Sequence, residues 1–591
     1  MQFVIGAVTS VKGTSVRALI NPNLYQTTYI YDGKLYRGVS INEYIVIKKG
    51  YHEIVGKIEG EEIIEKKNYN SEQPNSDKYD RFIDLKIIGY VQDNNFQPGI
   101  KYLPMIQDGL FLASDSLISA IYTFSGKVDS KSITIGRSLL EDIPIRIPIN
   151  GVFNSHLGIF GNTGSGKSNT LAKLYIELLT SYKDRIFANS RFMFIDFNGE
   201  YRTMHNIFKD CSSYVELDTH AVAGKDKLLL KQSEFWDAEL LSVLFSATEK
   251  TQKPFLNILV RNRVEYGEEL NDYFQKTLQV MFGQNQHRET ISVLRSIIKI
   301  INPDNEENIG TELAAFSWFS RGESNKYYLG NFYPNTPEEY LVHTPLLRST
   351  FINPERLTAF EQLSVRATLQ LIQSVSRNYV QYEHISPLIG KINASTKSLE
   401  KVIEIISDVE IHPTPLTFIS LKNCNQDIKK TIPMMIAKCS FLEHKRFEEK
   451  ARSFHLIIDE AHNILSESSV RESETWKDYR LELFEEIIKE GRKFGFFITI
   501  SSQRPADISP TIVSQIHNYF LHRLVNDNDI FLLKNSLNNL DSSSRSLIPS
   551  LPSGACVLSG TAFHTPVVIQ IERLSKELAP ESDTIDLDAY W

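Results

Sequence analysis

The ten residues from 161 to 170, GNTGSGKSNT, constrain the fold of this chain more than any other stretch. They fit the pattern of glycine, four residues, glycine, lysine and then serine or threonine that binds the phosphates of a nucleotide. Glycines let the backbone turn tightly, so that successive N–H groups point at the phosphates where the next helix begins. The residues that we expect at the nucleotide are Gly161, Asn162, Thr163, Gly164, Ser165, Gly166, Lys167, Ser168 and Asn169.

The sequence on either side gives this loop the context that it needs. The apolar run from His156 to Phe160 predicts a buried strand before the loop, and residues 169–183 predict a helix after it. Lys167 would add a positive charge at the phosphates, and the Ser168 hydroxyl would bind the Mg²⁺ that bridges them. We therefore expect ATP and Mg²⁺ as the cofactors.

Length and composition limit the class of protein. A chain of 591 residues is too long for one core. Its 64 basic and 72 acidic residues argue against a generally basic nucleic-acid coat, although they leave room for a basic channel. The four cysteines lie far apart, which is atypical of a zinc site or a disulfide framework. Since no apolar run approaches about 18 residues, we expect a cytoplasmic protein without a membrane span.

The pattern of the sequence changes along the chain. Residues 1–125 are dense in β-forming runs separated by turn residues, which predicts a small antiparallel barrel with a surface loop over 70–78. From 126 to 591, strand-like runs alternate with helical ones, as in an α/β protein with a parallel sheet. A mostly helical stretch at about 225–410 interrupts this alternation, and we expect it to be an insertion. Residues from about 573 to 591 would form a C-terminal tail.

Two acidic residues follow a second apolar run. In FHLIIDEAHNIL, Asp459 and Glu460 stand at the end of a predicted strand. An aspartate there holds Mg²⁺, and an adjacent glutamate polarises the water that attacks the phosphate. The two acids could instead cap a helix after a core strand, but the phosphate loop favours the catalytic interpretation.

A third segment, LFEEIIKEGRKFGFFITISSQRPADI, predicts a helix ending at Gly491, then a buried strand. Gln503 follows that strand and fits a sensor of the γ-phosphate, because neighbouring strands end at the same edge of a parallel sheet. Arg492 lies at the far end of the helix, from which it could reach the site of a neighbouring subunit. Alternatively, Arg492 would only stabilise the helix dipole, so its role stays open.

These segments together carry a family resemblance. An N-terminal barrel followed by GIFGNTGSGKSNT, FIDFNGEY, LIIDEAHNIL and EGRKFGFFITISSQRP resembles the HerA-like branch of the HerA/FtsK ring ATPases. The resemblance implies a RecA-like P-loop NTPase core in a homohexamer that moves double-stranded DNA through its centre, with the barrel docking a partner. It also implies a role for particular residues. Lys167 and Ser168 would belong to the phosphate loop, Asp459 would bind Mg²⁺ and Glu460 would activate the attacking water. Gln503 would sense the γ-phosphate, and Arg492 would be an arginine finger that completes the site of the next subunit.

The family signature D-x-x-G-E-Y falls on Asp196, Gly199, Glu200 and Tyr201. Glu200 would sense or assist the nucleotide, or it would be a structural acid of a turn. The family commonly has an arginine directly before the histidine of the first strand. That position is Ser155 here, which puts the role of a second arginine in doubt and leaves Arg523 as a substitute candidate.

The resemblance orders the functional alternatives. The first is an ATP-dependent DNA translocase or helicase that works with a nuclease or sirtuin-like effector, in DNA end processing or antiphage defence. The second is an ATP-bound scaffold ring that assembles and activates an effector, with DNA movement secondary. A conjugation or secretion pump of the VirB4 or TraG kind is third, because the barrel and the lack of a membrane span count against it.

Overall fold

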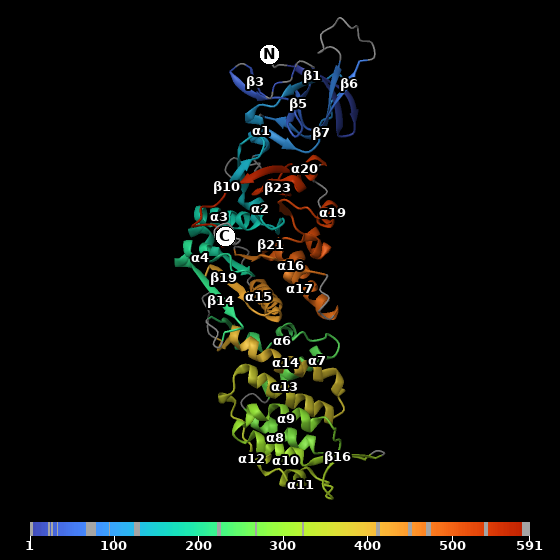
Figure 1. Cartoon of the computed structure of the whole chain (residues 1–591), viewed down its shortest axis with the longest axis vertical. Coiled ribbons are helices and arrows are strands. Elements are labelled where there is room, and N and C mark those ends of the chain that lie inside the picture. The colour runs from blue at the N-terminus through green and yellow to red at the C-terminus, as the bar shows by residue number, and fades with distance from the viewer. Residues whose placement is uncertain are drawn as a thin grey trace, which may run out of the picture.

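A computed structural model describes residues 4–581 with short gaps. The gaps are 22–23, 25, 27, 32, 67–78, 94, 123–130, 222–225, 266–268, 322–323, 409–413, 447–451, 468–473 and 537–541. The molecule is elongated, with a β-rich region at the N-terminal end, a mixed sheet in the middle and helices at the other end (Figure 1). The surface loop expected over 70–78 and the last residues of the expected tail lie outside the described residues.

Among the described residues, six strands close into a barrel at the N-terminal end. Their order is β2-β1-β9-β5-β6-β7, and antiparallel pairing of β2 with β7 closes the circle. Alternate residues face the interior, so that Val16, Ala18 and Ile20 of β2 are buried. The predicted barrel is thereby confirmed. The strands are β1 (Val4–Lys12), β2 (Ser15–Ile20), β5 (Tyr44–Lys49), β6 (His52–Glu65), β7 (Tyr79–Gln92) and β9 (Gly109–Leu112), with β8 (Asn95–Pro98) beside β7 and a separate hairpin of β3 (Thr28–Tyr31) and β4 (Lys34–Arg37).

In the described part of the chain, eleven strands form the central sheet in the order β11-β10-β24-β23-β22-β12-β21-β20-β13-β19-β14. Those from β22 to β14 run parallel, whereas β11, β10, β24 and β23 extend the sheet with antiparallel pairs. This confirms the expected α/β fold with a P-loop NTPase core. The strands are β10 (Ser132–Ser138), β11 (Pro144–Pro148), β12 (Leu157–Phe160), β13 (Ser190–Asp196), β14 (Ser212–Asp218), β19 (Leu416–Asn423), β20 (Ser453–Ile458), β21 (Phe496–Ser502), β22 (Asn518–Leu521), β23 (Ala555–Gly560) and β24 (Val567–Ile571).

The carboxyl ends of the central strands place the predicted motifs side by side. Phe160 at the end of β12 pairs with Ser502 at the end of β21, and Ile458 of β20 pairs with Ile195 of β13. The segments that follow these strands therefore emerge at one edge of the sheet. The helices of this region are α2 (Ile149–Phe153), α3 (Lys167–Asn189), α4 (Arg202–Ile207), α15 (Gln426–Arg446), α16 (His462–Leu465), α17 (Glu474–Phe494), α18 (Pro510–Ser514), α19 (Asp527–Ser536) and α20 (Ser542–Leu547), and α1 (Asp115–Ile121) follows the barrel.

Helices dominate the chain between β14 and β19. Parallel strands β15 (Leu228–Lys231) and β18 (Ile403–Ile406) tie the two ends of this region together, and β16 (Phe316–Arg321) and β17 (Ser324–Leu329) form a hairpin. The mostly helical insertion is thereby confirmed. Its helices are α5 (Gln232–Phe235), α6 (Ala238–Leu244), α7 (Gln252–Glu265), α8 (Leu270–Met281), α9 (Thr290–Ile301), α10 (Glu306–Ala314), α11 (Pro337–Val342), α12 (Pro345–Ser349), α13 (Ala359–Ser376) and α14 (Tyr382–Val402). Across the described residues, no helix has both the length and the apolar character needed to span a bilayer.

Helix α17 ends later than the sequence predicts. We expected its end at Gly491, but the helix continues to Phe494, and Gly495 follows with a φ of +77°. That left-handed backbone is typical of the glycine just beyond a helix. Gly491 serves close packing instead, since a Cβ there would lie 2.6 Å from the carbonyl oxygen of Phe496. Arg492 therefore belongs to the last turn of the helix.

Candidate nucleotide site

The phosphate loop between β12 and α3 has a backbone that requires glycine. Gly164 and Gly166 have φ values of +72° and +102°. A Cβ on Gly161 would lie 2.5 Å from the Cβ of His522, and one on Gly166 would lie 2.8 Å from the Cα of Gly554. The loop thus packs directly against His522 and Gly554, and its glycine-dependent backbone fits the binding of a nucleotide phosphate.

Two neighbouring segments hold the loop from outside. The Asn162 N–H donates to the carbonyl of Arg523 at 3.0 Å, and its side-chain oxygen accepts from the N–H of Val525 at 3.2 Å. On the other side, the N–H of Gly554 donates to the carbonyl of Ser165 at 2.9 Å. The side chain of Asn162 therefore anchors the loop to the segment that follows β22.

His522 forms the floor of the loop. Its side chain is fully buried, and burial lowers its pKa to about 4. At neutral pH the imidazole is therefore neutral and adds no second positive charge beside Lys167. No motif in the sequence pointed to His522, because its position depends on β22 pairing with β12.

Lys167, the first residue of α3, contacts both predicted acids. Its Nζ lies 3.5 Å from Asp459 Oδ1 and 3.2 Å from Glu460 Oε1. Burial disfavours the charged ammonium, yet the carboxylates of Asp459 and Glu460 raise the pKa of Lys167 above its ordinary value. The three residues are at most 5% exposed, so their charges interact with little screening by water.

Gln503 joins the loop to Glu460. Its amide nitrogen donates to Glu460 Oε1, and its amide oxygen accepts a hydrogen bond from the Thr163 hydroxyl. A side chain in this position contacts both the loop and the acid, as a sensor of the terminal phosphate must. The residue was predicted from the strand order, but its bond with Thr163 was not.

The signature Asp196 organises the turn after β13. Its carboxylate accepts main-chain N–H bonds from Asn198 at 3.2 Å, from Gly199 at 2.7 Å and from Tyr201 at 3.0 Å. Tyr201 in turn donates its hydroxyl to Asp459 Oδ2 at 2.9 Å. Burial raises the pKa of Asp196 to about 6. Asp196 thus fixes the turn, and Tyr201 orients the carboxylate predicted to hold Mg²⁺.

Glu200 lies within this group of acids. Burial, followed by the negative charge of Asp459, raises the pKa of Glu200, whereas the Asn198 amide and the Ser168 hydroxyl favour its ionised form. Ser168, Asp459 and Glu200 are the hard oxygen donors that suit Mg²⁺. The side chains present therefore fit a magnesium ion beside the phosphate loop.

The amide of Asn169 contacts the C-terminal segment. Its Nδ2 donates to the carbonyl of Glu572 at 3.2 Å, and its Oδ1 accepts from the N–H of Leu574 at 3.0 Å. Further along the same segment, the N–H of Glu581 donates to the carbonyl of Glu200 at 2.8 Å. These bonds give the Asn169 side chain a structural role, and its contact with the nucleotide stays a prediction.

The structure does not bring Arg492 to this site. Arg492 lies in the last turn of α17, next to the amino end of β21, and its Nη1 is 3.4 Å from His517 Nε2. The phosphate loop is at the carboxyl end of the sheet. Arg523, by contrast, is exposed directly after β22 and beside the loop. Ser155 is buried, donates to the carbonyl of Val152 at 2.7 Å and has no charge to offer.

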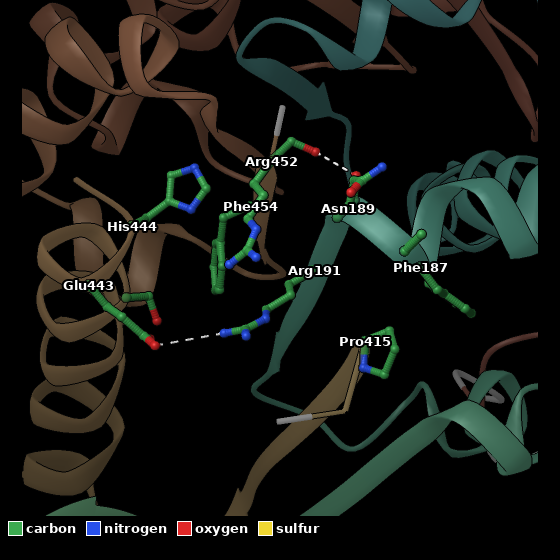
Figure 2. Close-up of a pocket in the computed structure, with 12 residues that line it drawn as sticks. Phe187, Asn189, Arg191, Pro415, Glu443, His444, Arg452 and Phe454 are labelled. Atoms are coloured by element: carbon green, nitrogen blue, oxygen red, sulfur yellow. Dashed lines mark hydrogen bonds and ion pairs between the residues drawn. The ribbon is translucent and has the colours of Figure 1, made fainter. Parts of the chain in front are cut away.

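A cavity of about 230 Å³ lies on the edge of the sheet opposite the phosphate loop. Its walls are the carboxyl ends of α3 and α15 and the amino ends of β13 and β20 (Figure 2). Arg191 points across it to Glu443, with 3.8 Å between Nη1 and Oε1. Carboxyl ends of helices favour cations, so Arg191 and Arg452 have a structural explanation there.

The fold and the site together define a P-loop NTPase. Residues 133–316 match the family described as the central domain of the helicase HerA. A probable helicase of Methanocaldococcus jannaschii is 21% identical over 514 residues, covering 86% of this chain and 82% of the relative. The DNA double-strand break repair helicase HerA of Sulfolobus acidocaldarius is 21% identical over 503 residues, covering 84% and 78%.

Among solved structures, VirB4 of Thermoanaerobacter pseudethanolicus is 14% identical, with a TM-score of 0.43, and the match covers 77% of this chain and 100% of that one. The family match and the curated relatives confirm the resemblance expected from the sequence. This chain is thus similar to helicases of the HerA kind over most of its length.

Proposed function

We propose that the chain is an ATP-dependent motor that moves double-stranded DNA and works as a homohexameric ring. The proposal depends on one observation above all: the loop, Lys167, Asp459, Glu460 and Gln503 meet at one edge of the sheet. This is the arrangement that nucleotide hydrolysis requires. The relatives named as helicases support DNA as the substrate that is moved.

Each side chain has a separate task in this proposal. The loop N–H groups and Lys167 bind the phosphates of ATP, and Ser168 and Asp459 hold Mg²⁺. The ion supplies positive charge to the phosphate oxygens. Glu460 accepts a proton from the attacking water. Gln503, bonded to Glu460, senses whether the terminal phosphate is present.

Arg492 acts in trans in the proposed ring. It lies at the edge of the sheet away from its own phosphate loop, so the site that it can complete belongs to the next subunit. Arginine fingers of this kind contribute on the order of 10³-fold or more in rate. Hydrolysis would then depend on ring assembly.

A mixing experiment tests this role. Rings of Lys167→Ala subunits alone are expected to be inactive, and rings of Arg492→Ala subunits alone to keep on the order of 10⁻³ of the wild-type rate. In randomly mixed hexamers, about a quarter of the sites pair an intact loop with an intact neighbouring arginine, so activity should partly return. Retained activity of Arg492→Ala alone, with mixed rings that gain none, would leave Arg492 with only a helix-capping role.

Duplex DNA should bind in the ring through its phosphates. We expect DNA to stimulate ATP hydrolysis without sequence preference, and the affinity to fall steeply with salt because counterions are released. ATPase activity in a salt series with and without duplex DNA measures both. If DNA neither stimulates hydrolysis nor binds in a salt-dependent way, the scaffold alternative replaces the motor.

The barrel is the proposed docking face for an effector, either a nuclease or a sirtuin-like enzyme. Met105 and Ile106 on a barrel loop are 60% and 64% exposed, and they would supply apolar contacts to such a partner. The pathway would be DNA end processing or antiphage defence. The protein that copurifies with the full-length chain, and the gene beside its own, distinguish the two.

A further inference from the structure

We propose that His517 is a positioning residue that holds the Arg492 guanidinium in the direction of the next subunit. This inference rests on the proposed role of Arg492 in trans. It starts from the contact of Arg492 Nη1 with His517 Nε2 at 3.4 Å. The two residues come from different elements, the last turn of α17 and the residue before β22.

The backbone of His517 is fixed on both sides. Its N–H donates to the carbonyl of His156 at 3.1 Å, and its carbonyl accepts from the N–H of Thr561 at 3.0 Å. A Cβ on Gly560 would lie 2.2 Å from the His517 carbonyl oxygen, so β23 packs directly against this residue. The imidazole is therefore attached to the rigid part of the sheet.

Arg492, in contrast, is held by few contacts. Its side chain is exposed in the last turn of a helix, where a free arginine loses considerable rotamer entropy when it adopts one direction. In the part of the chain that the structure describes, Arg492 forms no ion pair, and His517 is its side-chain hydrogen-bond partner. A fixed acceptor reduces the entropy that is lost when the guanidinium binds a phosphate.

A neutral imidazole beside Arg492 suits the role of an arginine finger better than a carboxylate would. Burial, followed by the positive charge of Arg492, lowers the pKa of His517. The neighbouring His156, whose ring centre is 6.0 Å away, also has its pKa lowered by burial, to about 4. Both rings are neutral at neutral pH. His517 can therefore orient the guanidinium as an acceptor without neutralising the charge that the neighbouring phosphate needs.

Helix capping does not explain this contact. A cation in the last turn of a helix interacts with the helix carbonyls whether or not an imidazole lies beside it. The capping role therefore predicts no effect of His517 on ATP turnover, whereas positioning predicts a loss that depends on Arg492. The difference makes the inference testable.

The test compares full-length His517→Ala, His517→Gln, Arg492→Ala and the double variant His517→Ala, Arg492→Ala in steady-state ATP hydrolysis. His343→Ala, an exposed histidine of the helical insertion, is the matched control. His517→Ala should lower kcat about tenfold, the effect of a lost bond to a charged group, with KM for ATP unchanged. The glutamine amide oxygen can also accept, so His517→Gln should keep most of the activity. Ring assembly is checked for every variant by its elution volume.

The double variant separates positioning from general damage. It should hydrolyse ATP no more slowly than Arg492→Ala alone, because the two residues act as one unit. The positioning role is wrong if His517→Ala hydrolyses ATP as fast as wild type, or if His517→Gln is as slow as His517→Ala. It is also wrong if His517→Ala lowers kcat by the same factor in the Arg492→Ala background as in the wild-type background. If Arg492→Ala itself stays active, the finger and the positioning role both fail. An inactive Arg492→Ala beside a fully active His517→Ala overturns only the positioning role.

Discussion

Replacing Glu460 by glutamine tests the chemistry of the site and changes little else. Glu460 Oε1 lies 3.2 Å from Lys167 Nζ and also accepts a hydrogen bond from the Gln503 amide. A glutamine carbonyl oxygen can accept both bonds, so we expect Lys167 and Gln503 to keep their positions. The variant then lacks only the carboxylate that we propose takes a proton from the attacking water.

The expected effects on turnover and on binding differ. A general base contributes about 10²–10⁴ in rate, so kcat should fall by that factor, or about 3 to 5 kcal/mol in activation free energy. Lys167, Asp459 and Glu460 carry one positive and two negative charges, a sum of −1. Glutamine brings the sum to zero. An anionic nucleotide should therefore bind at least as well as in wild type.

Two measurements on the same preparation check this prediction. Steady-state phosphate release gives kcat, and titration with a fluorescent ATP analogue gives the dissociation constant. Glu338→Gln, an exposed glutamate in the first turn of α11, is the matched control. Turnover of Glu460→Gln at a near wild-type rate would refute the role of Glu460 as base, and lost nucleotide binding would show that the carboxylate is needed to build the site.

Three further perturbations test other parts of the molecule. Lys167→Ala should abolish phosphate release at saturating ATP, because it removes the charge proposed to neutralise the migrating phosphate, and persistent hydrolysis would contradict this. Asp196, with a pKa raised from 3.8 to about 6, binds its proton more tightly in the folded state, so stability should fall as pH rises from about 4 to 6. Asp196→Asn should remove that fall in thermal unfolding midpoints, while the lost bond to the Tyr201 N–H costs about 1 to 3 kcal/mol. Deletion of residues 1–125 should abolish binding of the copurifying effector but leave some ATPase; lost oligomers with retained effector binding would reverse that assignment.

The parts of the fold that local patterns determine could be predicted from the sequence. The alternation in the first 125 residues predicts the barrel, and the glycine pattern predicts the loop. Placement of Gln503 beside Glu460 needed one more rule, that parallel strands end at a common edge. The prediction that α17 ends at Gly491 was wrong, because Gly491 is needed for the close approach of Phe496, which exists only in the folded chain.

Contacts between segments far apart in the sequence were not predictable. His517 meets Arg492, and His522 supports the loop, only because β22 lies next to β12 in the sheet. The Asn169 amide, expected at the nucleotide, bonds with Glu572 and Leu574. An asparagine in the first turn of a helix gives no local signal of which main chain will reach it. Strand order is a property of the whole fold, and these roles follow from it.

Strand β21 runs from the end of the sheet where Arg492 lies to the end where the phosphate loop lies. It therefore limits how neighbouring sites can be coupled in the proposed ring. Arg492 stands just before β21 and Gln503 just after it, and this seven-residue strand spans about 20 Å. Its main chain is bonded to β12 on one side and to β20 on the other, so it cannot stretch or slide by itself. A change that moves Gln503 relative to the loop therefore either stays local to its side chain or moves β21 together with its neighbouring strands. The second would also displace an arginine offered to the next subunit, so in the proposed ring we expect coupling between sites to involve the sheet and not the Gln503 side chain alone.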